Sequence, residues 1–433
     1  MTHRFSRRTL LGASVGTGVG AAVMGDASRA APLASASALF GDVETYERFG
    51  DHRTGGPADQ HTSRWIARRL STAGMTATLH PFVHDVFALE RATMRTDGDT
   101  FDLFPAWPAR AVHNLQGPLA LPRSDTALEA GAIAFVRLAY APNATLAAPG
   151  YRAPLEAAAR ARAAAIVAAT EGPTGEIIAL NADLSARIAS IPILLAAGRD
   201  AARLEAAAQL GVRARLDVTG IDTAHGQAFN VIGYRPGVGR ALVISTPSSG
   251  WFRCAGERGA GVAIFLALAG WAMGAVPNPL AFVATSGHEF EGLGSAHLFE
   301  ALALKPEDTA LWVHLGANVA SRTVTLDNGR VTGADTPSLP RYAGATSDLL
   351  AQAAEAFAGQ PGYSTPFDIA TQRALGDLAL YYGQGFHHIL GLLGASPLHH
   401  TRLDTAANGV LPGELETTTG SLRRFISAVL GLS

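Results

Sequence analysis

Residues 241–295 read ALVISTPSSGWFRCAGERGAGVAIFLALAGWAMGAVPNPLAFVATSGHEFEGLGS, and this stretch decides the fold. Its two apolar runs, Ala241–Ser245 and Leu280–Thr285, predict two buried strands. The small and apolar residues of Gly259–Met273 lie between these runs and predict a buried helix. Strand, helix and strand in this order are typical of a parallel sheet whose strands are joined by crossover helices.

Polar side chains follow each of the two predicted strands. Ser248–Arg258 comes after the first strand, and His288–Glu291 comes after the second. In open sheets of this kind, ligands bind outside the carboxyl ends of the strands. We therefore expect the two polar clusters to meet in one crevice.

The composition of the whole chain indicates a globular protein with a large core. Of its 433 residues, 48% are hydrophobic and 16% are charged, and this length is sufficient for two or three domains. The formal net charge of -2 gives no indication of a nucleic-acid partner. The single cysteine, Cys254, excludes an intrachain disulfide. No oligomeric state is predicted.

The amino terminus, residues 1–36, is predicted to be a targeting signal. Ser6-Arg7-Arg8-Thr9-Leu10-Leu11 resembles the twin-arginine export motif of bacteria. The moderately apolar stretch Leu10–Met24 is shorter than the roughly 20 residues of a membrane span, and small residues near Ala27–Ala36 offer cleavage sites. We expect export by the twin-arginine route to the periplasm or the medium, with no membrane span in the mature protein. The alternative is an ordinary flexible start in which two arginines are adjacent by chance.

The remaining pattern predicts a main domain interrupted by an inserted one. Residues 112–220 contain short apolar strands and alanine-rich helices without a cluster of catalytic side chains, which predicts a separate insert. The main domain then comprises residues 37–111 and 221–433. After residue 295, strands are predicted at Leu311–Gly316, Leu378–Tyr382 and Ile389–Leu393, and helices at Ser347–Phe357 and Glu414–Leu430.

The chain after the signal resembles the M28 family of zinc peptidases with an inserted protease-associated (PA) domain. The residues that carry this resemblance are Asn230-Val231-Ile232-Gly233, Gly287-His288-Glu289 with Gly292, Gly294 and Ser295, and His400-Thr401 with Asp404-Thr405. The resemblance implies an α/β fold with a mixed, largely parallel sheet flanked by helices. It also implies that residues 112–220 form a PA-like domain.

The sequence departs from this family at several of the positions that bind its two metal ions. Thr246-Pro247-Ser248 replaces the first His-x-Asp, and Gly316 falls near a ligand acid. The bridging aspartate corresponds to Glu257, the general-base glutamate to His288 and the adjacent ligand glutamate to Glu289. The last ligand histidine is kept as His400. The resemblance therefore implies an incomplete metal site.

Glu257, Glu289 and His400 are the predicted ligands of one zinc ion, a set that resembles the single-zinc site of glutaminyl cyclases. Zinc accepts carboxylate and imidazole ligands, and catalytic sites often have three from the protein. His314 is a candidate further ligand because it points to the same face of its strand as Gly316. The alternatives are a Glu257–Arg258 ion pair of purely structural role, a helix-start carboxylate at Glu289 and a core histidine at 314.

The predicted catalytic residues are His288, as the base that takes a proton from water, and Arg258, as a cation that binds an oxyanion or a carboxylate. Ser249 and Trp251 are predicted to contact the substrate. The sequence thus predicts an exported hydrolase of an amide or peptide-type bond in a small molecule or peptide. Two alternatives stay open: a metal-free acid–base enzyme that uses Glu257, Arg258 and His288, and a binding protein without turnover.

Overall fold

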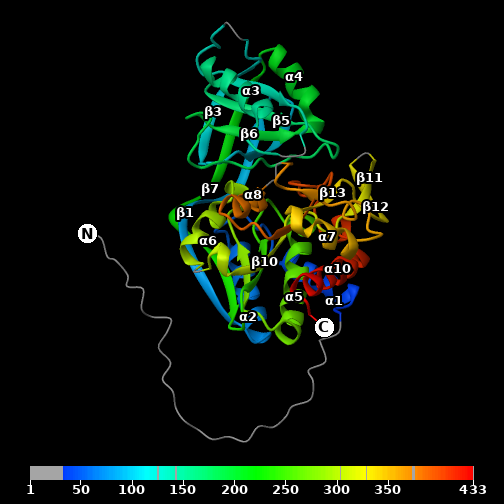
Figure 1. Ribbon diagram of the computed structural model, residues 1–433. Helices are drawn as coiled ribbons and strands as arrows, with labels where there is room; N and C mark the ends of the chain where they lie inside the picture. The colour runs from blue at the N-terminus through cyan, green and yellow to red at the C-terminus, as the bar shows by residue number, and fades with distance from the viewer. Residues whose placement is uncertain are drawn as a thin grey trace, which may run out of the picture.

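Two long antiparallel strands connect the two lobes of the molecule. The computed structural model describes residues 33–123, 126–141, 144–302, 304–327, 329–372 and 376–432. In it, β1 (Thr76–Arg95) and β7 (Arg213–Arg235) pair along nearly their whole length. One end of this ribbon belongs to the central sheet, and the other end enters a second lobe (Figure 1). The predicted signal, residues 1–36, lies almost wholly outside the described residues.

The central sheet is mixed, with a parallel middle. Its strand order is β1-β7-β9-β8-β10-β15-β13-β14, and the four strands β9, β8, β10 and β15 run parallel, while β7 and β13 flank them in the antiparallel sense. The bounds are β8 Ala241–Pro247, β9 Leu280–Thr285, β10 Thr309–Leu315, β13 Arg341–Ala345, β14 Phe367–Asp368 and β15 Ile389–Gly394. Every residue of β8 and β9 is buried, because helices cover both faces of the sheet. The two predicted strands and their parallel pairing are confirmed.

Helices form a layer on each face of this sheet (Figure 1). One layer contains α1 (Ala36–Arg48), α2 (Pro57–Thr72), α5 (Ala260–Ala275), α7 (Leu350–Ala356) and α10 (Pro412–Leu430). The other layer contains α6 (Leu293–Ala301) and α8 (Gly376–Gly383). Among the described helices, the one at Ala255–Ala275 has the length and hydropathy of a membrane span, and it is mostly buried in this core.

The second lobe has a core of its own. Its strands are β2 (Thr100–Pro105), β3 (Val112–Ala120), β4 (Ile133–Leu138), β5 (Ala165–Thr170) and β6 (Ile193–Ala197), and its helices are α3 (Pro149–Arg160) and α4 (Ala201–Gln209). β3, β4, β5 and β6 pair in parallel, and β2 lies between β6 and the end of β1, antiparallel to both. Trp251, Phe252 and Phe290, which belong to the lobe of the central sheet, pack into this core. The two lobes therefore share a buried apolar contact beside the polar loops.

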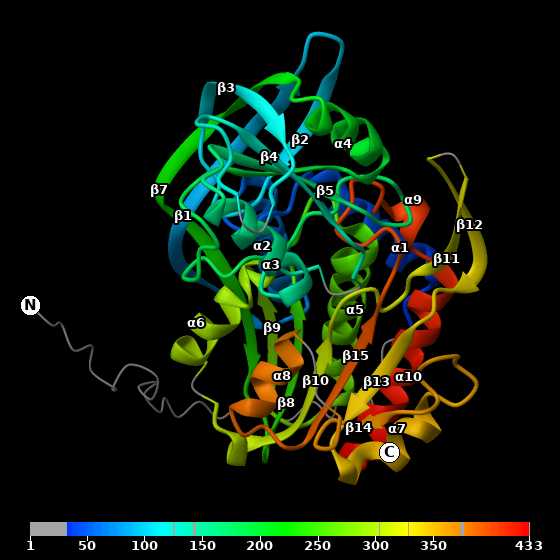
Figure 2. The same cartoon turned by 90° about the horizontal axis from the view of Figure 1, so that it is seen from above.

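Two parts of the chain differ from the sequence prediction. Leu378–Tyr382 was predicted as a strand, which is wrong, because these residues lie in helix α8 with Leu378 and Tyr381 turned inward at helical spacing. A short apolar run is compatible with either element, and only packing decides between them. β11 (Arg322–Asp327) and β12 (Arg330–Pro337) form a separate hairpin that was not predicted, and it projects at one side of the molecule (Figure 2).

Candidate active site

The loops that follow β8, β9, β10 and β15 surround one cavity of about 660 Å³. Arg258, from the first predicted polar cluster, and His288, from the second, both line it. The predicted crevice is therefore present at the carboxyl edge of the parallel strands. The second lobe contributes to its wall as well, through Thr145 and Asn181.

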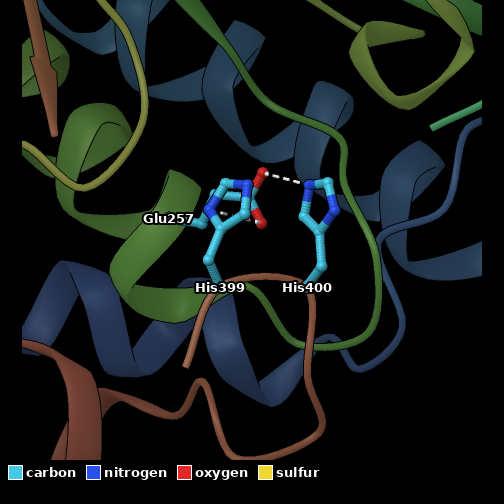
Figure 3. A group of neighbouring side chains, drawn as sticks. All are labelled: Glu257, His399 and His400. Carbon is cyan, nitrogen blue, oxygen red and sulfur yellow. Dashed lines mark ion pairs between the residues drawn. The ribbon is translucent and has the colours of Figure 1, made fainter. Parts of the chain in front are cut away.

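Three side chains converge beside this cavity in the way that a metal ion requires. The possible ligand atoms of Glu257, His399 and His400 all lie within 4.8 Å of one another. Glu257 Oε1 is 3.4 Å from His400 Nε2, and Glu257 Oε2 is 3.9 Å from His399 Nδ1. Figure 3 shows the two histidines on one loop, with their rings stacked at 3.9 Å between centroids, next to the Glu257 carboxylate, which comes from the start of a helix.

Glu257 is fixed by a short π-helical turn that precedes α5. The turn, Ala255–Gly259, follows Cys254, whose φ of 36° is in the left-handed region. Asp404 accepts hydrogen bonds from the backbone N–H groups of Gly256 (2.9 Å) and Glu257 (3.0 Å). π-helical turns are frequent at functional sites because they redirect a side chain. Asp404 thus ties this turn to the loop that carries His399 and His400.

His400 is oriented by the second lobe. Its Nδ1 lies 2.9 Å from the carbonyl oxygen of Ala179. A carbonyl oxygen only accepts, so Nδ1 carries a proton, and Nε2 faces the Glu257 carboxylate. Zinc-binding histidines are commonly oriented by such a bond from their other ring nitrogen.

His399 is the second histidine of this group. Its Nδ1 lies 3.0 Å from the side-chain nitrogen of Asn318, which is also directed at the carbonyl of Gly394. Burial lowers the pKa of His399 to about 3 despite the neighbouring Glu257 carboxylate. A neutral imidazole is the form that binds a metal ion.

The buried carboxylate of Glu257 supplies the negative charge of this group. Burial alone would raise the pKa of Glu257, but His399, Arg258 and His400 outweigh it and hold the pKa well below its usual value. Neither carboxylate oxygen has a partner with hydrogen-bond geometry among the described residues. Two imidazoles and one ionised carboxylate match the protein ligands of a catalytic zinc site, so the residues present fit one such ion.

Arg258 lies directly against this group. Its Nη2 is 2.7 Å from Glu257 Oε1, and its side chain is only 1% exposed. Its Nε and Nη1 atoms are buried and have no hydrogen-bond partner among the described residues. A fixed positive charge with unused donors therefore borders the cavity.

His288 forms a dyad with Asp377, which is the second residue of α8. His288 Nδ1 is 3.3 Å from Asp377 Oδ2, and the carboxyl group is buried while the imidazole is partly exposed. Burial would raise the pKa of Asp377, but His288 opposes it and the pKa falls to about 2. The carboxylate is thus ionised and holds the ring with its second nitrogen free for proton transfer.

Glu289 and Ser249 lie outside the three-residue group. Glu289 accepts hydrogen bonds from the Thr54 N–H (2.6 Å), the Thr54 hydroxyl (2.7 Å) and the Ser249 hydroxyl (2.7 Å). Ser249 also accepts one from the Gly287 N–H at 2.7 Å. The structure therefore places the Glu289 carboxylate in a buried network that fixes the loop after β9, and it places Ser249 in the same network.

His314 and Trp251 occupy two further environments. His314 lines the cavity, but its Nδ1 contacts the Ser245 hydroxyl at 3.0 Å, and burial lowers its pKa to about 4. Trp251 is buried in the core of the second lobe, and its Nε1 donates to Asn181 Oδ1 at 2.8 Å. It supports the cavity wall through Asn181.

The sequence prediction missed three residues that this site uses: Asp377 as a partner of His288, Asn181 as a wall residue and His399 as a possible ligand. Of these, His399 had a local signal, because it is adjacent to the predicted ligand His400 in a polar loop. Asp377 and Asn181 reach the site only through tertiary packing.

No family model and no curated protein matches this chain. Among solved structures, it is similar to the zinc aminopeptidase BSAP from Bacillus subtilis, with a TM-score of 0.71, 16% identity, and coverage of 92% of this chain and 95% of that chain. A peptidase M28 precursor from Shewanella amazonensis has a TM-score of 0.70 at 15% identity, over 91% and 96% of the two chains. An aminopeptidase from Aneurinibacillus sp. strain AM-1 has a TM-score of 0.63 at 14% identity, over 91% and 94%. These likenesses confirm the predicted fold, that of M28 zinc aminopeptidases.

Proposed function

We propose that this protein is a hydrolase that cleaves an amide or peptide-type bond in the cavity at the carboxyl edge of its sheet. The observation that carries this proposal is the convergence of Glu257, His399 and His400, whose possible ligand atoms all lie within 4.8 Å of one another. A carboxylate and two imidazoles gathered this closely can bind one metal ion together. The proposed ligands of one zinc ion are therefore Glu257, His399 and His400.

A zinc ion bound there would supply a Lewis acid that polarises a carbonyl group and acidifies water. His288 is the proposed general base and general acid. Because Asp377 accepts from Nδ1, the other ring nitrogen accepts a proton from water and then returns it to the leaving nitrogen. Arg258 offers its unused N–H groups to negative charge in the substrate. The substrate class proposed here is a small molecule or short peptide.

The experiment is metal analysis combined with an activity screen on the purified full chain. Zinc-loaded protein should contain about one ion per chain and should hydrolyse at least one member of a panel of short peptides and N-acyl amino acids. His288→Ala should reduce turnover by about 100-fold or more while the zinc content stays unchanged. Loss of the ion in His288→Ala would instead assign His288 to the metal, and a zinc-free protein after loading would reject the proposed site.

A second candidate function is binding without turnover. Arg258 lies 2.7 Å from Glu257, and the Glu289 carboxylate is already saturated by Thr54 and Ser249, so these acids are engaged by the protein itself. A protein that retains ligand affinity but shows no hydrolysis across the same panel, with or without zinc, would support this candidate.

We also propose that the protein is exported. The basic motif Ser6-Arg7-Arg8-Thr9 supports export by the twin-arginine route. Replacing Arg7 and Arg8 together by lysine should retain the protein in the cytoplasm of a bacterial host, and unchanged export would reject this route.

Residues 112–220 are proposed to be a PA-like domain that restricts access to the cavity, consistent with the place of Thr145 and Asn181 in the cavity wall.

A further inference from the structure

Arg258 has more hydrogen-bond donors than the protein uses. Its side chain is 1% exposed, and its Nη2 lies 2.7 Å from Glu257 Oε1. Nε and Nη1 are buried without an acceptor among the described residues, although a guanidinium group directs N–H bonds from all three nitrogens. Leaving charged donors unsatisfied in a buried site is costly, so an acceptor from outside the protein is expected.

The cavity shows where this acceptor comes from. Arg258 lines the cavity of about 660 Å³, which is large enough for a molecule of dipeptide size. Asn181, whose Oδ1 accepts a hydrogen bond from Trp251 Nε1, also lines the cavity, and its side-chain amide nitrogen is a further donor on this wall. Donors therefore come from both lobes, and a ligand that accepts hydrogen bonds fits between them.

The acids that line the cavity are already engaged. Asp377 pairs with His288, and Glu291 accepts a hydrogen bond from the Thr145 hydroxyl. A free ammonium group would thus have to compete with existing partners, whereas an anion meets the unused donors of Arg258. The buried carboxylates of Glu257 and Asp377 disfavour a doubly charged anion, so a singly charged carboxylate fits better than a phosphate.

The remaining residues of the cavity lining indicate what kind of molecule the carboxylate belongs to. Tyr342, Leu380 and Leu393 line the same cavity and offer an apolar wall. We propose that the ligand of this cavity is an N-acyl amino acid, or the carboxyl end of a short peptide, whose free carboxylate binds Arg258. This inference rests on the proposed function for the bond that is cleaved, but the binding step requires neither zinc nor turnover.

The test is isothermal titration of the full chain after removal of metal by a chelator. N-acetyl-L-leucine should bind at least about tenfold more tightly than N-acetyl-L-leucinamide, which has the same shape without the charge. L-leucinamide, which has a free amino group, and inorganic phosphate should bind more weakly than N-acetyl-L-leucine. Equal affinity for the acid and the amide, or tighter binding of L-leucinamide or phosphate, would overturn the inference.

Two variants localise the effect. Arg258→Lys keeps the charge but loses the planar set of donors, and it should weaken acid binding by about tenfold while amide binding stays the same. Asn181→Asp has nearly the same shape and adds a negative charge to the cavity wall, so it should also weaken binding of the acid alone. If the thermal transition shows that Arg258→Lys does not fold, Asn181→Asp serves as the test in its place. Unchanged acid affinity in a folded variant counts against the inference, whatever the outcome of the hydrolysis assay.

Discussion

Ala179 and His400 exchange two hydrogen bonds across the junction of the two lobes. The Ala179 N–H donates to the His400 carbonyl, and His400 Nδ1 donates to the Ala179 carbonyl, both at 2.9 Å. In the same segment, Asn181 accepts from Trp251, and the Ala182 N–H donates to the Glu289 carbonyl at 3.0 Å. One strap of the second lobe, residues 179–182, therefore contacts the loops that carry Trp251, Glu289 and His400.

The first prediction concerns zinc and stability. Zinc at 100 times its dissociation constant should raise the free energy of unfolding of the wild type by about 2.7 kcal/mol, because it binds the folded state. His400→Ala should abolish this stabilisation, since it removes one of the proposed ligands. Thermal unfolding with and without zinc measures both. His388→Ala, which alters a partly exposed histidine paired with Asp348, is the control and should respond to zinc like the wild type.

The second prediction concerns the dyad. Asp377→Asn removes the negative charge that stabilises a protonated His288, so kcat should fall by about 100-fold or more while the zinc content stays the same. Steady-state kinetics on whichever substrate the screen identifies, with KM recorded separately, measures this. Asp348→Asn alters the carboxylate paired with His388 at 2.8 Å and should leave kcat unchanged. Comparable kcat in Asp377→Asn and the wild type would rule out a catalytic dyad.

The third prediction concerns the contact between the lobes. Asn181→Ala leaves the buried indole N–H of Trp251 without its acceptor, which should cost about 1–3 kcal/mol of unfolding free energy. Trp251→Phe removes this donor, so adding Asn181→Ala to Trp251→Phe should cost much less than adding it to the wild type. Urea unfolding of the four proteins gives the coupling energy. Strictly additive effects would show that this hydrogen bond does not contribute to stability.

The fourth prediction concerns pH. Burial raises the pKa of Asp59 to about 8, with the Gly55 N–H opposing the rise and the Glu289 carboxylate adding to it. The unfolded carboxyl group titrates near 3.8, so between about pH 4 and pH 8 the folded chain holds a proton that the unfolded chain lacks. Asp59 therefore makes the free energy of unfolding fall as pH rises through this window, and the loss is complete above the folded pKa.

Asp59→Asn should flatten this dependence, because the amide keeps an oxygen for the Gly55 N–H and the Ser286 hydroxyl but does not ionise. Relative to the wild type, the variant should be more stable at pH 9 than at pH 5. Urea unfolding of chelator-treated protein between pH 5 and pH 9 measures this. Asp99→Asn, at an exposed ion pair with Arg203, provides the control. Parallel pH curves for Asp59→Asn and the wild type would contradict the raised pKa.

Local sequence determined the frame of the protein. The apolar runs that became β8 and β9 are buried throughout, and the apolar helix α5 between them is buried along most of its length. Burial of such runs is a property of the residues themselves, so the sequence predicted the parallel sheet and the edge where Arg258 and His288 meet.

Only the tertiary structure decided which side chains form the site. Glu289 and His399 each had an acceptable local pattern, but packing pairs Glu289 with Thr54, 235 positions away, and places His399 beside Glu257. Likewise, α8 brings Asp377 to His288, and the second lobe brings Ala179 to His400, 221 positions away. Hydrogen bonds and ion pairs act over a few ångströms, so their partners are set by how the elements pack, whereas the tendency of an apolar run to be buried is already present in the run itself.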